Sequence, residues 1–241
     1  MIDELLKRHR LISDQVDEKE LRVILRELLA VLDYNVLGDV VEFGCYKGTT
    51  SLFLARVLES LRGEHSSTKQ SHGTSQSRLL RSARNDEENE GLAVSERFAS
   101  LFLYDSFAGL PEKTALDNSR VGEQFVAGEL LATKSELLKN FRRENLPMPI
   151  IKKSWFCDLT AADVPHEICF AFFDGDFYES IRDSFRVCNP YFSPGATIVI
   201  DDYQNEALPG ASKAADEWLR QNSTRIKSFR VERSLGIIKI S

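Results

Sequence analysis

The sequence contains little of what marks several classes of protein. Its 241 residues include four cysteines without a CxxC pair, so reduced thiols are favoured over disulfides or a cysteine zinc site. The four histidines form no HxxxH or HExxH pattern. No apolar stretch approaches the ~20 residues that a membrane-spanning helix needs. These absences argue against a disulfide scaffold, a zinc enzyme and a membrane partner.

Basic charge is scarce as well. The formal net charge is -6 and the isoelectric point is near 5.4, whereas a general nucleic-acid binder carries a basic surface. Residues 1–4 lack the basic flank and the apolar centre of a signal peptide. We therefore expect a cytoplasmic protein that has no nucleic-acid partner.

Two short apolar runs are each followed by carboxylates. The run at 168–173 precedes Asp174 and Asp176, and the run at 196–200 precedes Asp201 and Asp202. A run this short is typical of a strand buried on both faces, so each pair should sit where a central strand leaves a parallel sheet. Ligands of open α/β sheets bind just beyond that edge.

Four carboxylates that converge at one edge repel one another unless protons or a divalent cation neutralise them. Their hard oxygen atoms suit magnesium, calcium or manganese. The alternative is that these aspartates are helix N-caps and turn formers, as Asp often is after a strand. That alternative explains one cluster more readily than two.

Strand and helix patterns alternate along most of the chain. A helical entry is expected over 3–32, and further helices at 49–61, 135–145, 178–191 and 212–221. Short apolar runs predict strands at 39–43, 100–104, 149–153, 168–173, 196–200, 226–233 and 235–240. The pattern indicates an α/β fold: a doubly wound, mostly parallel seven-stranded sheet with an antiparallel C-terminal hairpin. We expect an N-terminal helical segment over 1–37 and one domain over 38–241.

Two segments interrupt this alternation. Residues 62–97 are polar, Ser-rich and then acidic, so they have too little apolar surface to offset their ordering entropy. We expect an exposed, largely disordered insertion, and we favour a tolerated surface insertion over a substrate or partner loop. Residues 112–132 are either a lid that excludes water or an ordinary long connection.

The first predicted strand ends in a glycine-containing turn. Gly44 and Gly48 allow close approach of the backbone to a ligand, and the next helix offers free amides at its N-terminus. The second strand ends in Asp105, where a nucleotide ribose lies in folds of this type. Both NAD and S-adenosylmethionine fit these features. The spacing is not GxGxxG, which disfavours NAD.

These motifs together resemble the macrocin O-methyltransferase family. The resemblance rests on five stretches in the family's order: 38–48, 105–111, 155–156, 174–180, and 201–203 with 209–217. It implies a Rossmann-like class I methyltransferase fold, S-adenosyl-L-methionine and Mg2+ as cofactors, and methylation of sugar hydroxyls on secondary metabolites. One departure is Ser154, where the family usually has Gly before the Trp-Phe pair.

The resemblance also implies roles for individual residues. Asp176 matches the general base, and Asp174, Asp201 and Asp202 match the metal ligands. The residues implied to bind the cofactor are Glu42, Gly44, Tyr46, Gly48, Thr49, Asp105, Ser106, Trp155 and Asp174. Among these, Glu42, Gly44 and Gly48 would line the methionine end and Asp105 would hold the ribose.

The sequence allows two roles for each of four aromatic residues near these motifs. Trp155 and Phe156 either contact adenine or pack in the core. Tyr178 and Tyr203 either orient the aspartates or serve capping and packing.

The sequence thus favours a cofactor- and magnesium-dependent O-methyltransferase that acts on a hydroxyl of a sugar or a glycosylated small molecule. A catechol-type O-methyltransferase acting on an aromatic diol is one alternative. A non-catalytic cofactor-binding module is another. The glycine turn, Asp105, the aspartates that match metal ligands and the candidate base occur together, and this combination disfavours such a module. The expected partner is a hydroxylated small molecule, and a homodimer is left open.

The polar segment generates a first prediction. Deletion of residues 66–90 should leave cooperative unfolding and cofactor binding in place, because the deleted residues offer little apolar surface to a core. Thermal unfolding with and without S-adenosylmethionine measures both properties. Loss of the cooperative transition on deletion would show that the segment is part of the folded core.

Overall fold

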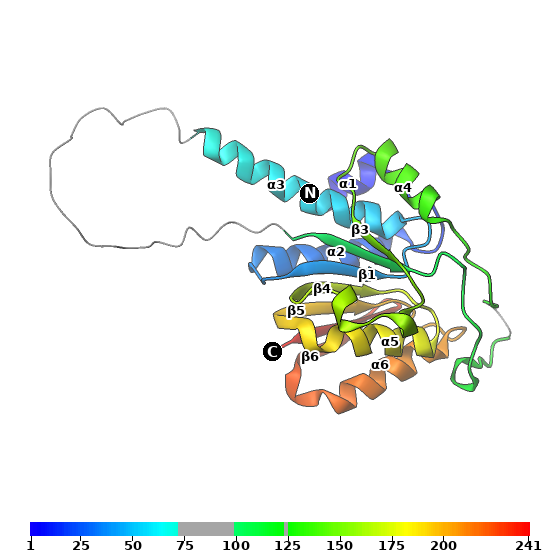
Figure 1. The fold of residues 1–241 in the computed structure, drawn as a ribbon. Coiled ribbons are helices and arrows are strands. Elements are labelled where there is room, and N and C mark those ends of the chain that lie inside the picture. The colour runs from blue at the N-terminus through cyan, green and yellow to red at the C-terminus, as the bar shows by residue number, and fades with distance from the viewer. Residues whose placement is uncertain (72–98, 123–124) are drawn as a thin grey trace, which may run out of the picture.

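A seven-stranded sheet forms the centre of the part of the chain that the computed structural model describes, which is residues 1–71, 99–122 and 125–241 (Figure 1). The strand order is β3-β2-β1-β4-β5-β7-β6. The first five strands in this order are parallel, and β7 runs antiparallel to both β5 and β6. The strands are β1 (Asp39–Phe43), β2 (Leu101–Asp105), β3 (Ile150–Lys153), β4 (Ile168–Phe173), β5 (Phe192–Ile200), β6 (Ile226–Glu232) and β7 (Leu235–Ile240). The predicted sheet and its C-terminal hairpin are confirmed.

The two central strands are buried along their whole length. Every residue of β1 and β4 is buried, as expected for parallel strands that are covered on both faces. Alternate side chains of β4 enter different cores: Phe170 and Phe172 face one side, and Ala171 and Phe173 face the other. The apolar run of β4 therefore supplies both halves of the core.

Helices cover both faces of the sheet (Figure 1). One core contains side chains of α2 (Glu18–Asp33), α3 (Thr49–Ser71) and α4 (Lys134–Arg143), and α1 (Ile2–Arg8) packs against it. The other core contains side chains of α5 (Tyr178–Cys188) and α6 (Pro209–Gln221). None of the helices in the described ranges has the length and apolar composition that a membrane span requires.

Several element boundaries differ from those expected. The N-terminal segment is two helices, because a capping box between Asp17 and Glu20 starts α2 after a loop at 9–17. Helix α6 starts at Pro209, since proline fits the first helical position. Helix α3 continues to Ser71, ten residues beyond its expected end at 61. Residues 72–97, the rest of the predicted insertion, lie outside the described residues.

A buried carboxylate ties α2 to the C-terminal hairpin. Glu27 is 3% exposed, and its oxygens lie 2.6 Å from Arg230 and 3.5 Å from Lys239. Arg26 bonds to Glu27 and also to Glu232 of β6. These ion pairs join the first long helix to the last two strands.

Glu27 generates a prediction on stability. Glu27→Gln should lower the free energy of unfolding by roughly 1–3 kcal/mol, because it removes the charge that several cations share. Urea denaturation measures the change. The matched control is Glu18→Gln on the same helix, an exposed residue paired with Arg22, which should change stability by less than about 1 kcal/mol. Equal effects of the two variants would contradict a special role for Glu27.

Candidate active site

The backbone ladder of the sheet continues one residue past the ends of the central strands. The Asp174 N–H donates to the Phe43 carbonyl at 2.8 Å, and the Asp201 N–H donates to the Phe173 carbonyl at 2.8 Å. In the same way the Gly44 N–H donates to the Tyr104 carbonyl at 2.9 Å. The first residue after each of β1, β4 and β5 is therefore held at one edge of the sheet.

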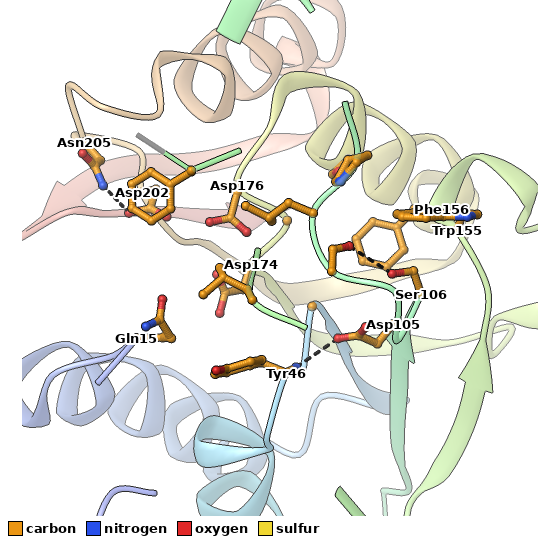
Figure 2. Close-up of a pocket in the computed structure, with 18 of the residues that line it drawn as sticks. Gln15, Tyr46, Asp105, Ser106, Trp155, Phe156, Asp174, Asp176, Asp202 and Asn205 are labelled. Atoms are coloured by element: carbon orange, nitrogen blue, oxygen red, sulfur yellow. Dashed lines mark hydrogen bonds between the residues drawn. The ribbon is translucent and has the colours of Figure 1, made fainter. Parts of the chain in front are cut away.

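A cavity of about 370 Å³ opens at this edge (Figure 2). Its size falls within the ~300–1,000 Å³ of small-molecule sites. It lies where the strand order changes direction around β1, the usual ligand position in such sheets. The predicted site residues that line it are Gly44, Tyr46, Asp105, Ser106, Trp155, Asp174, Asp176 and Asp202.

Asp105 holds the turn that follows β1. Its carboxylate accepts hydrogen bonds from the Cys45 and Tyr46 amides, each at 3.0 Å, and from the Phe107 amide at 2.6 Å. The Cys45 thiol also donates to Oδ2, at 3.7 Å, whereas Oδ1 accepts from the Phe107 amide alone among the hydrogen bonds of the described residues. One lone pair of Oδ1 therefore remains for a ligand hydroxyl. Tyr46 and Phe107 both have positive φ, 45° and 49°, a strained backbone that these bonds stabilise.

The turn is in tight contact with the segment after β4. A Cβ atom on Gly44 would lie 1.7 Å from the Asp174 carbonyl oxygen, so only glycine fits there. Gly48 and Thr49 do not reach the cavity wall. Gly48 packs against Leu137 of α4, where a Cβ would lie 2.3 Å from the leucine Cδ1, and the Thr49 hydroxyl bonds to that of Ser13 at 2.6 Å.

Glu42 lies behind the turn rather than in the wall of the cavity. It is 1% exposed, and its Oε2 has no hydrogen-bond partner among the described residues. Burial raises the pKa of this carboxyl to about 8, and the nearby charge of Asp105 adds to the increase. A buried, unpaired carboxyl oxygen beside a cavity is suited to a ligand that donates hydrogen bonds.

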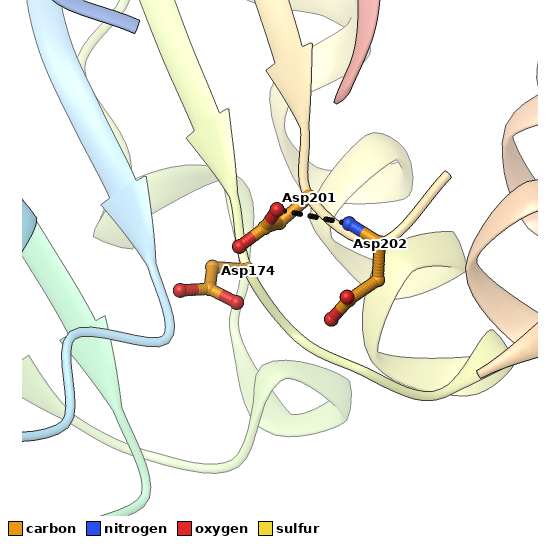
Figure 3. A group of neighbouring side chains, drawn as sticks. All are labelled: Asp174, Asp201 and Asp202. Atoms are coloured by element: carbon orange, nitrogen blue, oxygen red, sulfur yellow. Dashed lines mark hydrogen bonds between the residues drawn. The ribbon is translucent and has the colours of Figure 1, made fainter. Parts of the chain in front are cut away.

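Asp174, Asp201 and Asp202 form a group of carboxylates (Figure 3). One oxygen from each lies within 4.8 Å of the others. Burial raises the pKa of Asp174 and Asp201 well above the ordinary value, and the charge of a neighbouring aspartate adds to the increase in each case. Burial also raises the pKa of Asp202, while the hydrogen bond from Asn205 lowers it. Three carboxylate oxygens at this separation match the donor set that a hard divalent cation prefers.

Asp176 reaches the cavity from a tight turn. Its φ is 60°, and the Phe177 amide donates across it to the Gly175 carbonyl at 2.6 Å. Burial, with the charges of Asp202 and Asp105, raises the pKa of Asp176 to about 8. The turn separates this carboxyl from the group of three, although Asp174 is only two residues away.

Asn205 was not predicted from the sequence. Its Nδ2 donates to Asp202 Oδ1 at 2.8 Å (Figure 2), and its Oδ1 accepts from the Ala207 amide at 3.0 Å. Because the carbonyl side of the amide is engaged by an N–H donor, the NH2 side must face Asp202. Asn205 thereby fixes the orientation of the Asp202 carboxylate. An Asn three residues after an aspartate pair carries no signal that would have found it.

The aromatic residues divide into two roles. Trp155 and Phe156 both line the cavity, and Trp155 is 38% exposed. Phe156 also packs edge-on to Phe43, with 5.2 Å between the ring centroids. Tyr178 and Tyr203 donate to Glu217 and Asp216 of α6, so their hydroxyls hold that helix rather than the aspartates of the site.

The loop at 112–132 is held to the rest of the protein by hydrogen bonds in its first part and lines the cavity in its second part. Buried Asp117 accepts from the Tyr178 amide at 2.7 Å and thereby caps α5, whose own N-cap Phe177 has no side-chain bond. The Ser119 hydroxyl donates to the Glu206 carbonyl. Further along, Phe125 and Leu130 line the cavity.

The loop between α1 and α2 also reaches the site. Asp14 and Gln15 line the cavity, and Gln15 lies on the side of Asp174 and Asp202, opposite Ser106 and Trp155 (Figure 2). No motif in the sequence marks these two residues. Their position depends on how α2 packs on the sheet.

Comparison with known proteins identifies related sequences. The profile of the Macrocin-O-methyltransferase (TylF) family matches residues 91–232, more than half of the chain. The 8-demethyl-8-(2,3-dimethoxy-alpha-L-rhamnosyl)-tetracenomycin-C 4'-O-methyltransferase of Streptomyces olivaceus is 28% identical over 187 residues, 75% of this chain and 59% of that protein. Demethyldecarbamoylnovobiocin O-methyltransferase of Streptomyces niveus is 24% identical over 201 residues, 78% of this chain and 60% of that protein. The chain spans about three fifths of the length of both relatives.

Solved structures show the same fold. The O-methyltransferase NovP matches with a TM-score of 0.67 and 21% identity, over 94% of this chain and 81% of that one. The calicheamicin methyltransferase CalS11 matches with a TM-score of 0.62 and 15% identity, over 99% and 89%. An O-methyltransferase from Bacillus cereus in complex with SAH matches with a TM-score of 0.52 and 13% identity, over 100% and 90%.

The buried Glu42 generates a prediction on pH. In the ligand-free protein its folded pKa of about 8 exceeds the ordinary value of 4.5, so between these values the folded state binds more protons than the unfolded state. Stability from this group should therefore fall as pH rises from 4.5 to about 8. Between pH 6 and 8.5 the melting temperature of Glu42→Gln should fall by less than that of the parent protein, as measured by thermal unfolding. Glu18→Gln is the control, and it should follow the parent. Parallel pH profiles for Glu42→Gln and the parent would refute the assignment.

Proposed function

The chain belongs to the macrocin O-methyltransferase family, and from that premise we propose that it transfers a methyl group from S-adenosylmethionine to a hydroxyl of a sugar or glycosylated small molecule, with the help of a magnesium ion. The observation that carries the proposal is the meeting of three features at one cavity. These are the strained glycine turn after β1, the three carboxylates after β4 and β5, and the separate carboxyl of Asp176.

The residues at the turn fit the cofactor. Gly44 brings the backbone to the cavity where a Cβ has no room, and Glu42 offers an unpaired buried oxygen to the amino end of the ligand. Asp105 keeps capacity for one more hydrogen bond, as required for a ribose hydroxyl. Trp155 exposes its ring to the cavity beyond Asp105 and Ser106, a position suited to adenine (Figure 2).

The three carboxylates fit a magnesium ion. Burial is the largest cause of their raised pKa values, so the ionised forms are costly in the ligand-free protein, and a divalent cation would offset that cost. Asp174, Asp201 and Asp202 would be its ligands, and Asn205 would hold Asp202 in place.

The chemistry requires alignment and deprotonation of an alcohol, which is a poor nucleophile at neutral pH. When bound, the cofactor supplies an electrophilic methyl group and the metal ion lowers the pKa of nearby hydroxyls. Asp176 is placed to take the proton, because its carboxyl faces the cavity beside the ligand group while its own turn keeps it separate (Figure 2). Phe125 and Leu130 line the cavity from the loop and would help to exclude water from it.

Mass spectrometry of an acceptor panel tests the proposal directly. The protein is incubated with S-adenosylmethionine and magnesium, and with neutral glycosides or with catechol. A mass increase of one methyl group on a glycoside supports the proposal. Methylation of catechol alone would favour the aromatic-diol alternative, and cofactor binding without transfer to any hydroxyl would favour a non-catalytic module. The homodimer and the cytoplasmic location stay predictions from the sequence.

Replacing one ligand and the base should separate their roles. Asp201→Asn should abolish magnesium-dependent turnover and weaken magnesium binding, while cofactor affinity stays largely intact because Glu42 and Asp105 hold the cofactor. Asp176→Asn should lower turnover by roughly a hundredfold or more and leave magnesium affinity unchanged, as expected for a lost base. Turnover against magnesium concentration, with calorimetry of magnesium binding, distinguishes the two. Rescue of Asp176→Asn by excess magnesium would mean that the roles are exchanged or shared.

Asn205 allows a test of the cation site without catalysis. Asn205→Ala should raise the dissociation constant for magnesium by about tenfold, because residues that orient ligands contribute on this scale. Calorimetry of the protein with magnesium alone measures it. Asn222→Ala is the matched control, since Asn222 Nδ2 donates to a backbone carbonyl at the end of α6, away from the site. An unchanged constant in Asn205→Ala would show that Asp202 needs no orientation from Asn205.

A further inference from the structure

The capping box that starts α2 is connected to the loop that carries two of the three aspartates of the candidate cation site. Building on the proposed function, we infer that Glu20 is a positioning residue for that site. It holds the loop of Asp201 and Asp202 in place through the turn between β6 and β7, and its charge strengthens cation binding there. Two hydrogen bonds and the electrostatic effect of Glu20 on these aspartates support this role.

Glu20 accepts hydrogen bonds with both of its carboxylate oxygens. Oε2 accepts from the Asp17 amide at 3.2 Å, which closes the capping box of α2. Oε1 accepts from the Ser234 hydroxyl at 2.5 Å, across 214 positions of the chain. Ser234 lies in the two-residue turn between β6 and β7. A capping box requires only the first of these contacts, so the second is a separate connection to the hairpin.

The turn between β6 and β7 is connected in its turn to the aspartates. The Ser234 carbonyl accepts from the Gln204 amide at 3.1 Å, and Gln204 is the second residue after Asp202. Asp201 and Asp202 begin this loop at the end of β5 (Figure 3). The side chain of Glu20 is therefore two hydrogen bonds away from the backbone of the loop that presents both carboxylates to the cation site.

The charge of Glu20 is not neutralised by a neighbouring cation. In the ranges that the structure describes, no basic side chain forms an ion pair with Glu20, whereas Glu18 in the same turn pairs with Arg22 at 3.2 Å. Burial is the largest cause of the raised pKa of Asp201, and the charges of Asp202 and Glu20 add to it. Burial is also the largest cause at Asp202, where Glu20 again raises the pKa. The field of Glu20 thus reaches both aspartates, and a field that opposes further negative charge favours a cation.

Magnesium binding, measured by calorimetry with magnesium alone, tests this role without methyl transfer. Glu20→Gln keeps the capping box, which accepts Gln at this position, but removes the charge. Its dissociation constant for magnesium should rise by about threefold to tenfold, with a larger change at low salt. Ser234→Ala keeps the charge but removes the connection, and should raise the constant by about threefold or more. Ser234→Thr retains a hydroxyl and should bind magnesium as the parent protein does.

Two control variants remove similar groups elsewhere. Glu18→Gln removes an exposed charge from the same turn of α2 and should leave magnesium affinity unchanged. Ser60→Ala removes a hydroxyl that donates to a carbonyl within α3, and should also leave it unchanged. The melting temperature of each variant without metal is measured in parallel, because a purely structural role would lower the melting temperature and leave magnesium affinity as it is.

The outcomes distinguish this role from the proposed function. An unchanged magnesium affinity in either Glu20→Gln or Ser234→Ala would overturn the inference, since both the charge and the contact are required. An equal loss of affinity in Glu18→Gln would overturn it as well. If the parent protein bound no magnesium, the cation site of the proposed function would be refuted together with the role of Glu20. Unchanged variants of a protein that does bind magnesium would count against the role of Glu20 alone.

Discussion

The extension of the β1–β4–β5 ladder past the strand ends is the constraint on which the site depends. Two backbone hydrogen bonds hold Asp174 and Asp201 at the same level, so their carboxylates meet whether or not the charges favour it. Left alone, these charges would drive the strand ends apart. The core opposes them, because every residue of β1 and β4 is buried and the strands cannot separate without exposing both faces. The folding energy of the sheet thus maintains the electrostatic strain of the site.

The parts of this arrangement that follow local rules could be predicted from the sequence. The apolar run of β4 followed by Asp174 gives both a buried strand and the position of a carboxylate at its end, since strand direction and periodicity are local properties. The glycine turn and Asp105 follow from the same reasoning. The extension of α3 to Ser71 does not follow from composition, which is polar there, because several of those residues are good helix formers that continue an existing helix.

The remaining parts depend on contacts between distant segments. Asp117 caps α5 across 61 positions, and Gln15 reaches the cavity only because α2 packs on the sheet. The placement of Asp176 depends on a positive φ, which Asp adopts more readily than most residues but which no local motif marks at this position. Gly48 shows the converse: its place in the motif suggested a ligand contact, whereas its missing side chain makes room for Leu137.

The course of α3 places the two described ends of the long polar segment, Ser71 and Ala99, away from the cavity. The helix begins at the glycine turn beside the cavity and runs to the other edge of the sheet, where β2 also begins (Figure 1). The chain therefore departs at Ser71 and returns at Ala99 on the edge that the ligands do not use. A reporter domain or an affinity tag could be spliced between these two points without crossing the entrance to the cavity. A change of chain length between these two points would leave the strand ends that carry the site in place.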